Sequence, residues 1–415
     1  MARVAKTDHS WRMEQPVSTP TLSRVLTLPL LVFYGVGVTV GAGIFALIGE
    51  ILLVSGDLAP AAFLLAGVIA GMTGLSYALL VAIFPKAGGE AVFVNRGLGH
   101  ILGWFAGTGV AITGIISSAA IARAFAGYAG SIVPMPHSVL ILMVILLLAG
   151  VAAWGIRESV WFAAIITVLE VSTLLVVIAF GLPLLDNLPP ISQMLPHSID
   201  ATKPVLAGAV LAFLAFIGFE DIENMAEETL DPARTAPRAI FWTLGVTVFL
   251  YLALALVAIS SPIRDAISHS SAPMALLFGS TTGLDARPVI AIAAIAMING
   301  ILVQIVMAAR VIYGMANEGL LPAWFGTVSQ KRRTPLRATI TVALAIVILA
   351  LAVPLVQLAE ATSVVTLSVF ALVNLSLFTL GGNNAHPGLA RWRWVGLLGA
   401  AVCLLVLAFQ ASTWL

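Results

Sequence analysis

The chain has 415 residues, of which 60% are hydrophobic and only 9% are charged. A soluble domain is about one quarter charged, and no soluble fold buries this much apolar surface, so the water-soluble protein classes are excluded. The formal net charge of +1 indicates neither nucleic-acid binding nor a polybasic membrane-surface mode. The composition therefore predicts one integral membrane domain.

Long apolar runs, separated by charged or Pro/Gly-rich breaks, recur from residue 26 to near the end of the chain. A bilayer core about 30 Å thick needs about 20 residues of helix per span, whereas barrel strands are about ten residues long and alternate strictly. We therefore predict an all-α polytopic membrane protein with about eleven transmembrane helices. The predicted spans are 26–55, 58–84, 100–130, 138–155, 160–182, 204–228, 238–260, 288–316, 337–354, 356–380 and 394–411.

The positive charges predict the orientation in the membrane, because Lys and Arg accumulate in cytoplasmic loops. With a cytoplasmic N-terminus, the opposite side receives only Lys203, Arg264 and Arg287, and Arg123 lies at or within the third span. Residues 1–25 contain no short apolar segment that ends in a small-residue cleavage site, so we expect no cleaved signal peptide. These features predict a multi-pass protein of the bacterial inner (plasma) membrane with a cytoplasmic N-terminal tail, 1–25.

Two spans contain glycine-rich interruptions near their middles. At 1.5 Å per residue, each interruption lies about 22 Å from the start of its span, close to the bilayer midplane. Glycine favours a break in a helix, and the carboxylates that follow the second interruption are costly in lipid. The candidate binding residues are Gly41, Ala42, Gly43 and Ile44 in the first span and Phe216, Ile217, Gly218 and Phe219 in the sixth.

The two interrupted spans are related by inversion, because the first starts in the cytoplasm and the sixth starts outside. Transporters built from inverted repeats place their binding site between two such broken helices. We therefore predict a first inverted repeat at 26–182 (helices 1–5), a second at 183–380 (helices 6–10), and an additional C-terminal helix 11 at 381–415.

The unwound segments are expected to bind the substrate through their backbone. Unpaired backbone groups in a membrane are tolerated only where protein, water or ligand satisfies them. The N–H groups of 41–44 lie at the positive end of a half-helix and suit a carboxylate, whereas the carbonyls near Phe216 and Ile217 suit an ammonium. A zwitterionic α-amino acid, with one carboxylate and one ammonium group, matches these two half-helix ends. The alternative is that the glycines only allow tight helix packing.

Two buried acids are candidates for proton coupling or gating. Glu170 lies deep in the fifth span, where a lone ionised carboxylate is strongly disfavoured, so it is protonated, paired or exposed to water. The alternative to a proton carrier is a structural partner for Arg123 or for a backbone donor. Glu220, beside the second break, could gate the site, bind a cationic ligand or accept a proton. Glu223 and Glu227 continue its helix face and are expected to line an aqueous vestibule.

Several motifs are absent from the sequence. There is no Gly-x-x-x-x-Gly-Lys-Ser/Thr loop, which argues against a nucleotide-driven pump, and there is no nucleophile motif of an enzyme. The six histidines lack the spacing of metal ligands. We expect no metal and no cofactor beyond a proton gradient, with sodium left open. The expected partners are an amino acid substrate and the lipid bilayer, without nucleic acid or an obligate protein partner.

Five stretches of the sequence carry a resemblance to a known family, and they span ten of the predicted helices. They are GVGVTVGAGIFALIG at 35–49, PKAGGEAVFVNRGLG at 85–99, AFIGFEDIENMAEETLDPARTAPRAI at 215–240, AARVIYGMANEGLLP at 308–322 and ATSVVTLSVFALVN at 361–374. With them the chain resembles the amino acid-polyamine-organocation (APC) superfamily, and within it the bacterial amino acid permeases similar to cationic amino acid transporters.

The resemblance implies a leucine-transporter-like fold of 5+5 inverted repeats with discontinuous first and sixth helices. It also implies that Glu220 stands where the family often places an acidic gate residue. Proton-coupled relatives carry a fifth-helix lysine where this chain has Glu170, which leaves the coupling ion open. The family usually has twelve spans, and the last is not found here.

These observations predict a secondary active transporter that moves amino acids across the plasma membrane by alternating access, together with a proton. An amine, polyamine or amino acid exchanger is the alternative within transport. A membrane sensor that binds amino acids without moving them is the alternative outside it.

Overall fold

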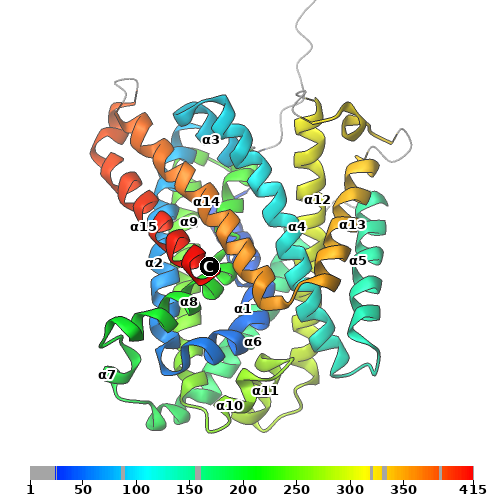
Figure 1. Ribbon diagram of the computed structural model, residues 1–415, viewed down its shortest axis with the longest axis vertical. Helices are drawn as coiled ribbons and strands as arrows, with labels where there is room; N and C mark the ends of the chain where they lie inside the picture. The colour runs from blue at the N-terminus through cyan, green and yellow to red at the C-terminus, as the bar shows by residue number, and fades with distance from the viewer. Residues whose placement is uncertain are drawn as a thin grey trace, which may run out of the picture.

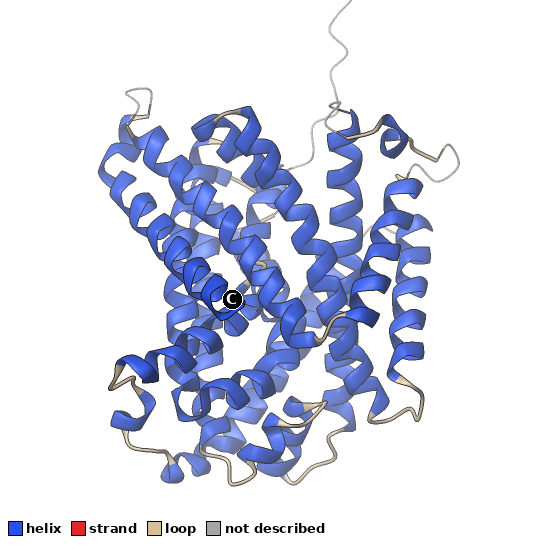
Figure 2. Cartoon of the chain, viewed as in Figure 1, coloured by secondary structure: helices blue, strands red, loops and turns tan. Residues whose placement is uncertain are grey.

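The computed structural model describes residues 24, 26–85, 89–154, 160–317, 321–329, 334–382 and 386–414. The predicted tail 1–25, apart from residue 24, and the side chain of Glu227 lie outside the described residues. The described chain is helical (Figure 2), and its β-structure is limited to one isolated bridge between Leu26 and Thr229. The all-α class predicted from the sequence is therefore confirmed.

Long helices cross the molecule, and shorter helices lie in the connections between them (Figure 1). The long helices are α1 (Leu28–Ser55), α2 (Ala59–Ile83), α4 (His100–Gly130), α5 (His137–Trp154), α6 (Val160–Gly181), α8 (Ile199–Phe216), α9 (Pro232–Ile259), α12 (Arg287–Asn317), α13 (Leu336–Ala352), α14 (Leu355–Gly381) and α15 (Arg393–Trp414). The shorter α-helices are α3 (Gly89–Leu98), α7 (Ile191–Met194), α10 (Arg264–Ser268) and α11 (Pro273–Thr282). The 3₁₀ helices are η1 (Gly56–Leu58), η2 (Leu182–Asn187), η3 (Phe219–Glu228), η4 (Ala323–Gly326) and η5 (Pro387–Trp392).

Nine segments of the described chain are long and apolar enough to cross a membrane. The first of them, Leu28–Ile83, contains both α1 and α2, and α13 is a shorter apolar helix of 17 residues. A helix of that length spans about 26 Å, at the lower limit for a bilayer core. The polytopic membrane class is confirmed, and the count of eleven spans stays a prediction.

Large apolar side chains cover the outside of the long helices. Leu147 on α5, Phe249 on α9 and Leu405 on α15 are each about two thirds exposed, at 65%, 66% and 69%. Apolar surface of this extent is unfavourable in water and favourable in lipid, where packing rather than burial from water holds helices together. The exterior is therefore suited to a bilayer.

The helices pack into two groups, and each group combines both halves of the chain. In the first group α1 packs against α8, and α2 packs against α9. In the second, α4 packs against α12, and α5 packs against α13 (Figure 1). In the order of the predicted spans, each of these pairs joins a helix to the one five spans later. The remaining long helices flank the two groups, with α6 against α1, α14 against α4, and α15 against α14.

Helix α1 is interrupted at Gly41, at the predicted place. The backbone there has φ −11° and ψ −137°, which is not helical. A Cβ added at Gly41 would meet no atom within 4 Å, whereas a Cβ added at Gly43 would lie 2.7 Å from Ala215 Cα on α8. Gly43 thus permits the close approach of the two helices, and Gly41 borders open space.

The sixth predicted span is interrupted at Ile217 and Gly218. Helix α8 ends at Phe216, Ile217 is extended, and Gly218 has φ 126°, a conformation that glycine adopts readily and other residues rarely do. The chain then continues as η3. A Cβ at Gly218 would lie 2.9 Å from the carbonyl carbon of Val38, just before the break in α1. The two interruptions are therefore in direct contact.

An aromatic cluster fixes the second interruption in place. The Phe216 ring lies 5.1 Å from that of Tyr251, and the Phe219 ring lies 5.8 Å from Tyr77 and 5.5 Å from Phe370. These centroid distances are typical of aromatic pairs, each of which adds about 0.5–1.5 kcal/mol to the effect of burial. The packing holds the end of α8 against α9, and the start of η3 against α2 and α14.

Candidate functional site

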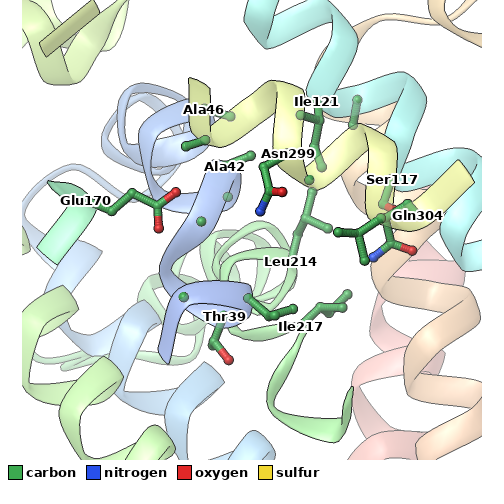
Figure 3. A pocket seen from close by; sticks show the side chains of 18 of the residues that line it. Thr39, Ala42, Ala46, Ser117, Ile121, Glu170, Leu214, Ile217, Asn299 and Gln304 are labelled. Atoms are coloured by element: carbon green, nitrogen blue, oxygen red, sulfur yellow. The ribbon is translucent and has the colours of Figure 1, made fainter. Parts of the chain in front are cut away.

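A cavity of about 70 Å³ lies at the break of α1, between the two helix groups. Its walls come from α1 and α8 of the first group, from α4 and α12 of the second, and from α6 and α14 (Figure 3). A buried water needs about 10–15 Å³ on this measure, so the space corresponds to about five waters. It is therefore suited to a small guest.

The structure brings half of the predicted binding residues to this cavity. Gly41, Ala42, Gly43 and Ile217 line it. The other four lie elsewhere in this conformation. Ile44 is completely buried and is not among the residues that line the cavity. The rings of Phe216 and Phe219 belong to the aromatic cluster, and Gly218 packs against Val38.

Glu170 reaches the cavity from α6. Its side chain is only 2% exposed, and its Oε2 has no hydrogen-bond partner among the described residues. Figure 3 shows its carboxylate directed at the α1 segment that carries Ala42. Arg123, considered as a structural partner, instead donates from Nη1 to the Ala350 carbonyl at 2.8 Å. None of the ion pairs among the described residues includes Glu170.

Glu220 does not line the cavity, although it is buried beside it. The N–H of Gly218 donates to Glu220 Oε2 at 2.8 Å. The carboxylate therefore satisfies a backbone donor that the interruption leaves without a helical partner, which stabilises the break from within its own segment. In this conformation its contact is with the chain rather than with the open space.

Glu223 was expected to line an aqueous vestibule, and that expectation is wrong. Its side chain is completely buried, and a Cβ added at Gly89 on α3 would overlap its carboxyl group. Nearby, the Tyr77 hydroxyl donates to Glu90 Oε1 at 3.2 Å. The sequence pattern placed Glu223 on the same helix face as Glu220 but could not show that α3 packs over that face.

Tyr251 on α9 joins the two interruptions and was not singled out in the sequence. Its hydroxyl lies 3.0 Å from the carbonyl oxygen of Thr39 and 2.8 Å from that of Ala215. Both carbonyls lie at the ends of half-helices, where intrahelical partners are missing. The sequence could have indicated this role, because a tyrosine in an apolar span is buried and its hydroxyl needs a hydrogen-bond partner.

Outside α1, three further polar side chains of the cavity were missed in the sequence. Asn299 and Gln304 come from α12, and Ser117 comes from α4. Figure 3 shows the Asn299 carboxamide near the α1 segment and Gln304 beside Ser117 at the other end of the cavity. The sequence feature that could have identified the two carboxamides is their presence in the run 288–309, which is otherwise apolar. They provide neutral hydrogen-bonding groups opposite the α1 break.

Interrupted helices around a small cavity that carries a few polar groups, in a molecule with an apolar exterior, are typical of a polytopic membrane transporter. The sequence model of the amino acid permease family matches residues 26–413. The chain therefore belongs to the amino acid permease family, within the APC superfamily, as the sequence motifs predict. It is a transporter and not an enzyme.

Three relatives of the chain are named as transporters. An uncharacterized transporter of Mycobacterium tuberculosis is 32% identical over 94% of this chain and 86% of its own length. The mitochondrial cationic amino acid transporter 3 of Arabidopsis thaliana is 28% identical over 86% of this chain and 62% of its own length. The methylthioribose transporter of Bacillus subtilis is 26% identical over 95% of this chain and 90% of its own length.

Proposed function

We propose that the protein is a secondary active transporter that moves an α-amino acid across the plasma membrane by alternating access, coupled to a proton. The observation that carries the proposal is the cavity at which the α1 break and the end of α8 meet. Relatives named as cationic amino acid transporters support an amino acid substrate.

The proposed fold is the 5+5 inverted repeat of 26–182 and 183–380, with α15 outside the repeats. The packing of each helix on its counterpart five spans later supports it, as do the two interruptions at corresponding depths. The proposed orientation has a cytoplasmic N-terminus in a bacterial inner membrane. It places α7, α10 and α11, at the bottom of Figure 1, on the outer side.

The substrate is proposed to bind with its two charged groups at the two interruptions. Its carboxylate faces the N–H groups at Ala42 and Gly43, where the second half of α1 begins and its dipole is positive. Its ammonium faces the end of α8 at Ile217, where the dipole is negative. Because both ends border one cavity, a single zwitterion can contact both of them.

Glu170 is the proposed proton carrier, and Glu220 is the proposed gate. Glu170 lines the cavity without an ion pair in the described part of the chain, so its ionised form is costly and its proton is linked to what the cavity holds. Protonation of Glu220 would weaken its hydrogen bond from Gly218 and loosen the second break. Opening of the second break would then depend on the same proton gradient that drives transport.

Uptake into proteoliposomes tests the proposal. The twenty common L-amino acids and methylthioribose are supplied with and without an imposed pH gradient, and we expect gradient-driven uptake of at least one amino acid. Glu170→Gln should abolish gradient-driven uptake and leave exchange intact. Asp285→Asn, an exposed carboxylate on the surface, is the control. Unchanged uptake in Glu170→Gln removes this residue from coupling, and absence of amino acid uptake in the wild type overturns the proposal.

An amine or polyamine exchanger is the second candidate. The observation that favours it is the same Glu170 carboxylate, because an anionic group in the cavity suits a cationic guest. Diamines should then compete with labelled amino acid in counterflow, and uptake should not respond to the pH gradient. Counterflow of any solute also excludes a sensor that binds without transport.

A further inference from the structure

A second cavity, of about 150 Å³, adjoins the central one. Ala46 and Leu355 line both cavities, so the two spaces are neighbours. The second cavity is built from the second half of α1, the end of α4, the start of α5 and the segment that leads into α11. It therefore lies beyond the Gly41 break from the start of α1, on the outer side in the proposed orientation, and we call it the outer cavity.

One acidic and two basic side chains line the outer cavity. They are Glu50 on α1, Arg123 on α4 and His137 at the start of α5. Glu50 and Arg123 have opposite charges, yet neither belongs to any ion pair among the described residues. Charged groups in a spanning helix are costly unless they face water or a partner, which makes them candidates for ligand binding.

The Arg123 guanidinium is held in place by the protein. Its Nη1 donates to the carbonyl oxygen of Ala350 on α13 at 2.8 Å. This bond uses one of its five N–H donors, and the structure shows no described residue accepting from the others, which can therefore bind a carboxylate. His137 is positioned by a close approach to α4, since a Cβ added at Gly130 would lie 3.0 Å from its Nε2. Glu50 and Arg123 thus line one cavity without forming an ion pair with each other.

We propose that the outer cavity is a second amino acid site, which holds the α-ammonium group at Glu50 and the α-carboxylate at Arg123. Because neither group forms an ion pair with another described residue, a simple anion would leave the charge of Glu50 unpaired, and a simple cation would leave that of Arg123 unpaired. A zwitterion neutralises both charges at once. This inference rests on the proposed transport of amino acids and adds a site through which the substrate passes before it reaches the Gly41 break.

The hydrogen bonds around the outer cavity connect it to both the central site and the outer segment. The Tyr128 hydroxyl, in the cavity wall, donates to the Phe45 carbonyl at 2.8 Å and accepts from the Met274 N–H of α11 at 3.2 Å. The second half of α1 and the α11 segment are therefore bonded to the same side chain. A ligand between Glu50 and Arg123 lies directly beside this connection.

Equilibrium binding to the full-length protein in lipid nanodiscs tests the inference. The probe is the labelled L-amino acid with the highest uptake among the twenty. We expect two molecules bound per wild-type chain and one per chain in Glu50→Gln and in Arg123→Gln. Arg287→Gln, an exposed arginine on the surface, should retain two. The α-amide and the decarboxylated amine of the same amino acid, which both lack the carboxylate charge that Arg123 would bind, should fail to displace the probe from the outer site.

The outcomes separate the two proposals. One molecule bound per wild-type chain, with uptake intact, overturns the second site and leaves transport standing. Two molecules bound in a folded Glu50→Gln protein overturn it as well. Glu50→Gln decides the question if Arg123→Gln fails to fold, because the carboxamide preserves the shape of the side chain. A wild-type chain that neither binds nor transports any of the twenty overturns both proposals.

Discussion

Replacing Tyr251 with phenylalanine removes a single hydroxyl from the contact between the two interruptions. The ring of Tyr251 is completely buried, and its packing against Phe63 and Phe216, at 5.7 and 5.1 Å, remains. The carbonyls of Thr39 and Ala215 then lose their shared donor. One hydroxyl proton donates fully to only one acceptor at a time, and a buried acceptor without a donor costs about 1–3 kcal/mol. We expect the free energy of unfolding to fall by that amount.

The same loss should appear in transport, because the hydroxyl keeps both half-helix ends beside the cavity. If this contact is made in the substrate-binding conformation, a change of about 1–3 kcal/mol corresponds to about a 5- to 150-fold weaker apparent substrate affinity. Denaturant titration of the purified protein in detergent measures the stability. The concentration dependence of uptake into proteoliposomes measures the affinity.

Tyr313→Phe is the matched control for this experiment. Tyr313 lies on α12, beyond Gln304 and outside the lining of the cavity. The control should change the free energy of unfolding by less than about 0.5 kcal/mol, as is usual away from special features. If Tyr251→Phe behaves like the control in both assays, the hydroxyl does not hold the two interruptions together, and the reasoning is refuted.

Two further substitutions test the packing at the first interruption, and a third tests an ion pair. A Cβ at Gly41 meets no atom within 4 Å, so Gly41→Ala should leave thermal unfolding nearly unchanged and, by filling the cavity, raise the KM for uptake about tenfold. Gly43→Ala should instead lower the free energy of unfolding by about 1–3 kcal/mol, because its Cβ would lie 2.7 Å from Ala215 Cα. Equal stability of the Gly41→Ala and Gly43→Ala variants would contradict this expectation. Asp57→Asn removes the partner of Arg264 in a pair with side chains 34–35% exposed, so the loss should stay below about 1 kcal/mol and shrink in high salt.

The sequence by itself determined the class of the protein and the positions of its two interruptions. Lipid offers no hydrogen bonds to the backbone, so long apolar runs must form helices, and the class follows from composition alone. The sequence also predicted the breaks at Gly41 and Gly218, because glycine permits a non-helical backbone conformation at its own position. The family motifs added the substrate class and the site as expectations.

The tertiary structure decided which side chains meet at the interruptions. Spans that are apolar all round give no periodic signal of which face is turned inward, so the sequence could not separate Ile217, which lines the cavity, from Phe219, which packs on Tyr77. For the same reason it did not show that Tyr251 lies between Thr39 and Ala215. Contacts between helices far apart in the chain depend on packing, and packing is a property of the folded molecule.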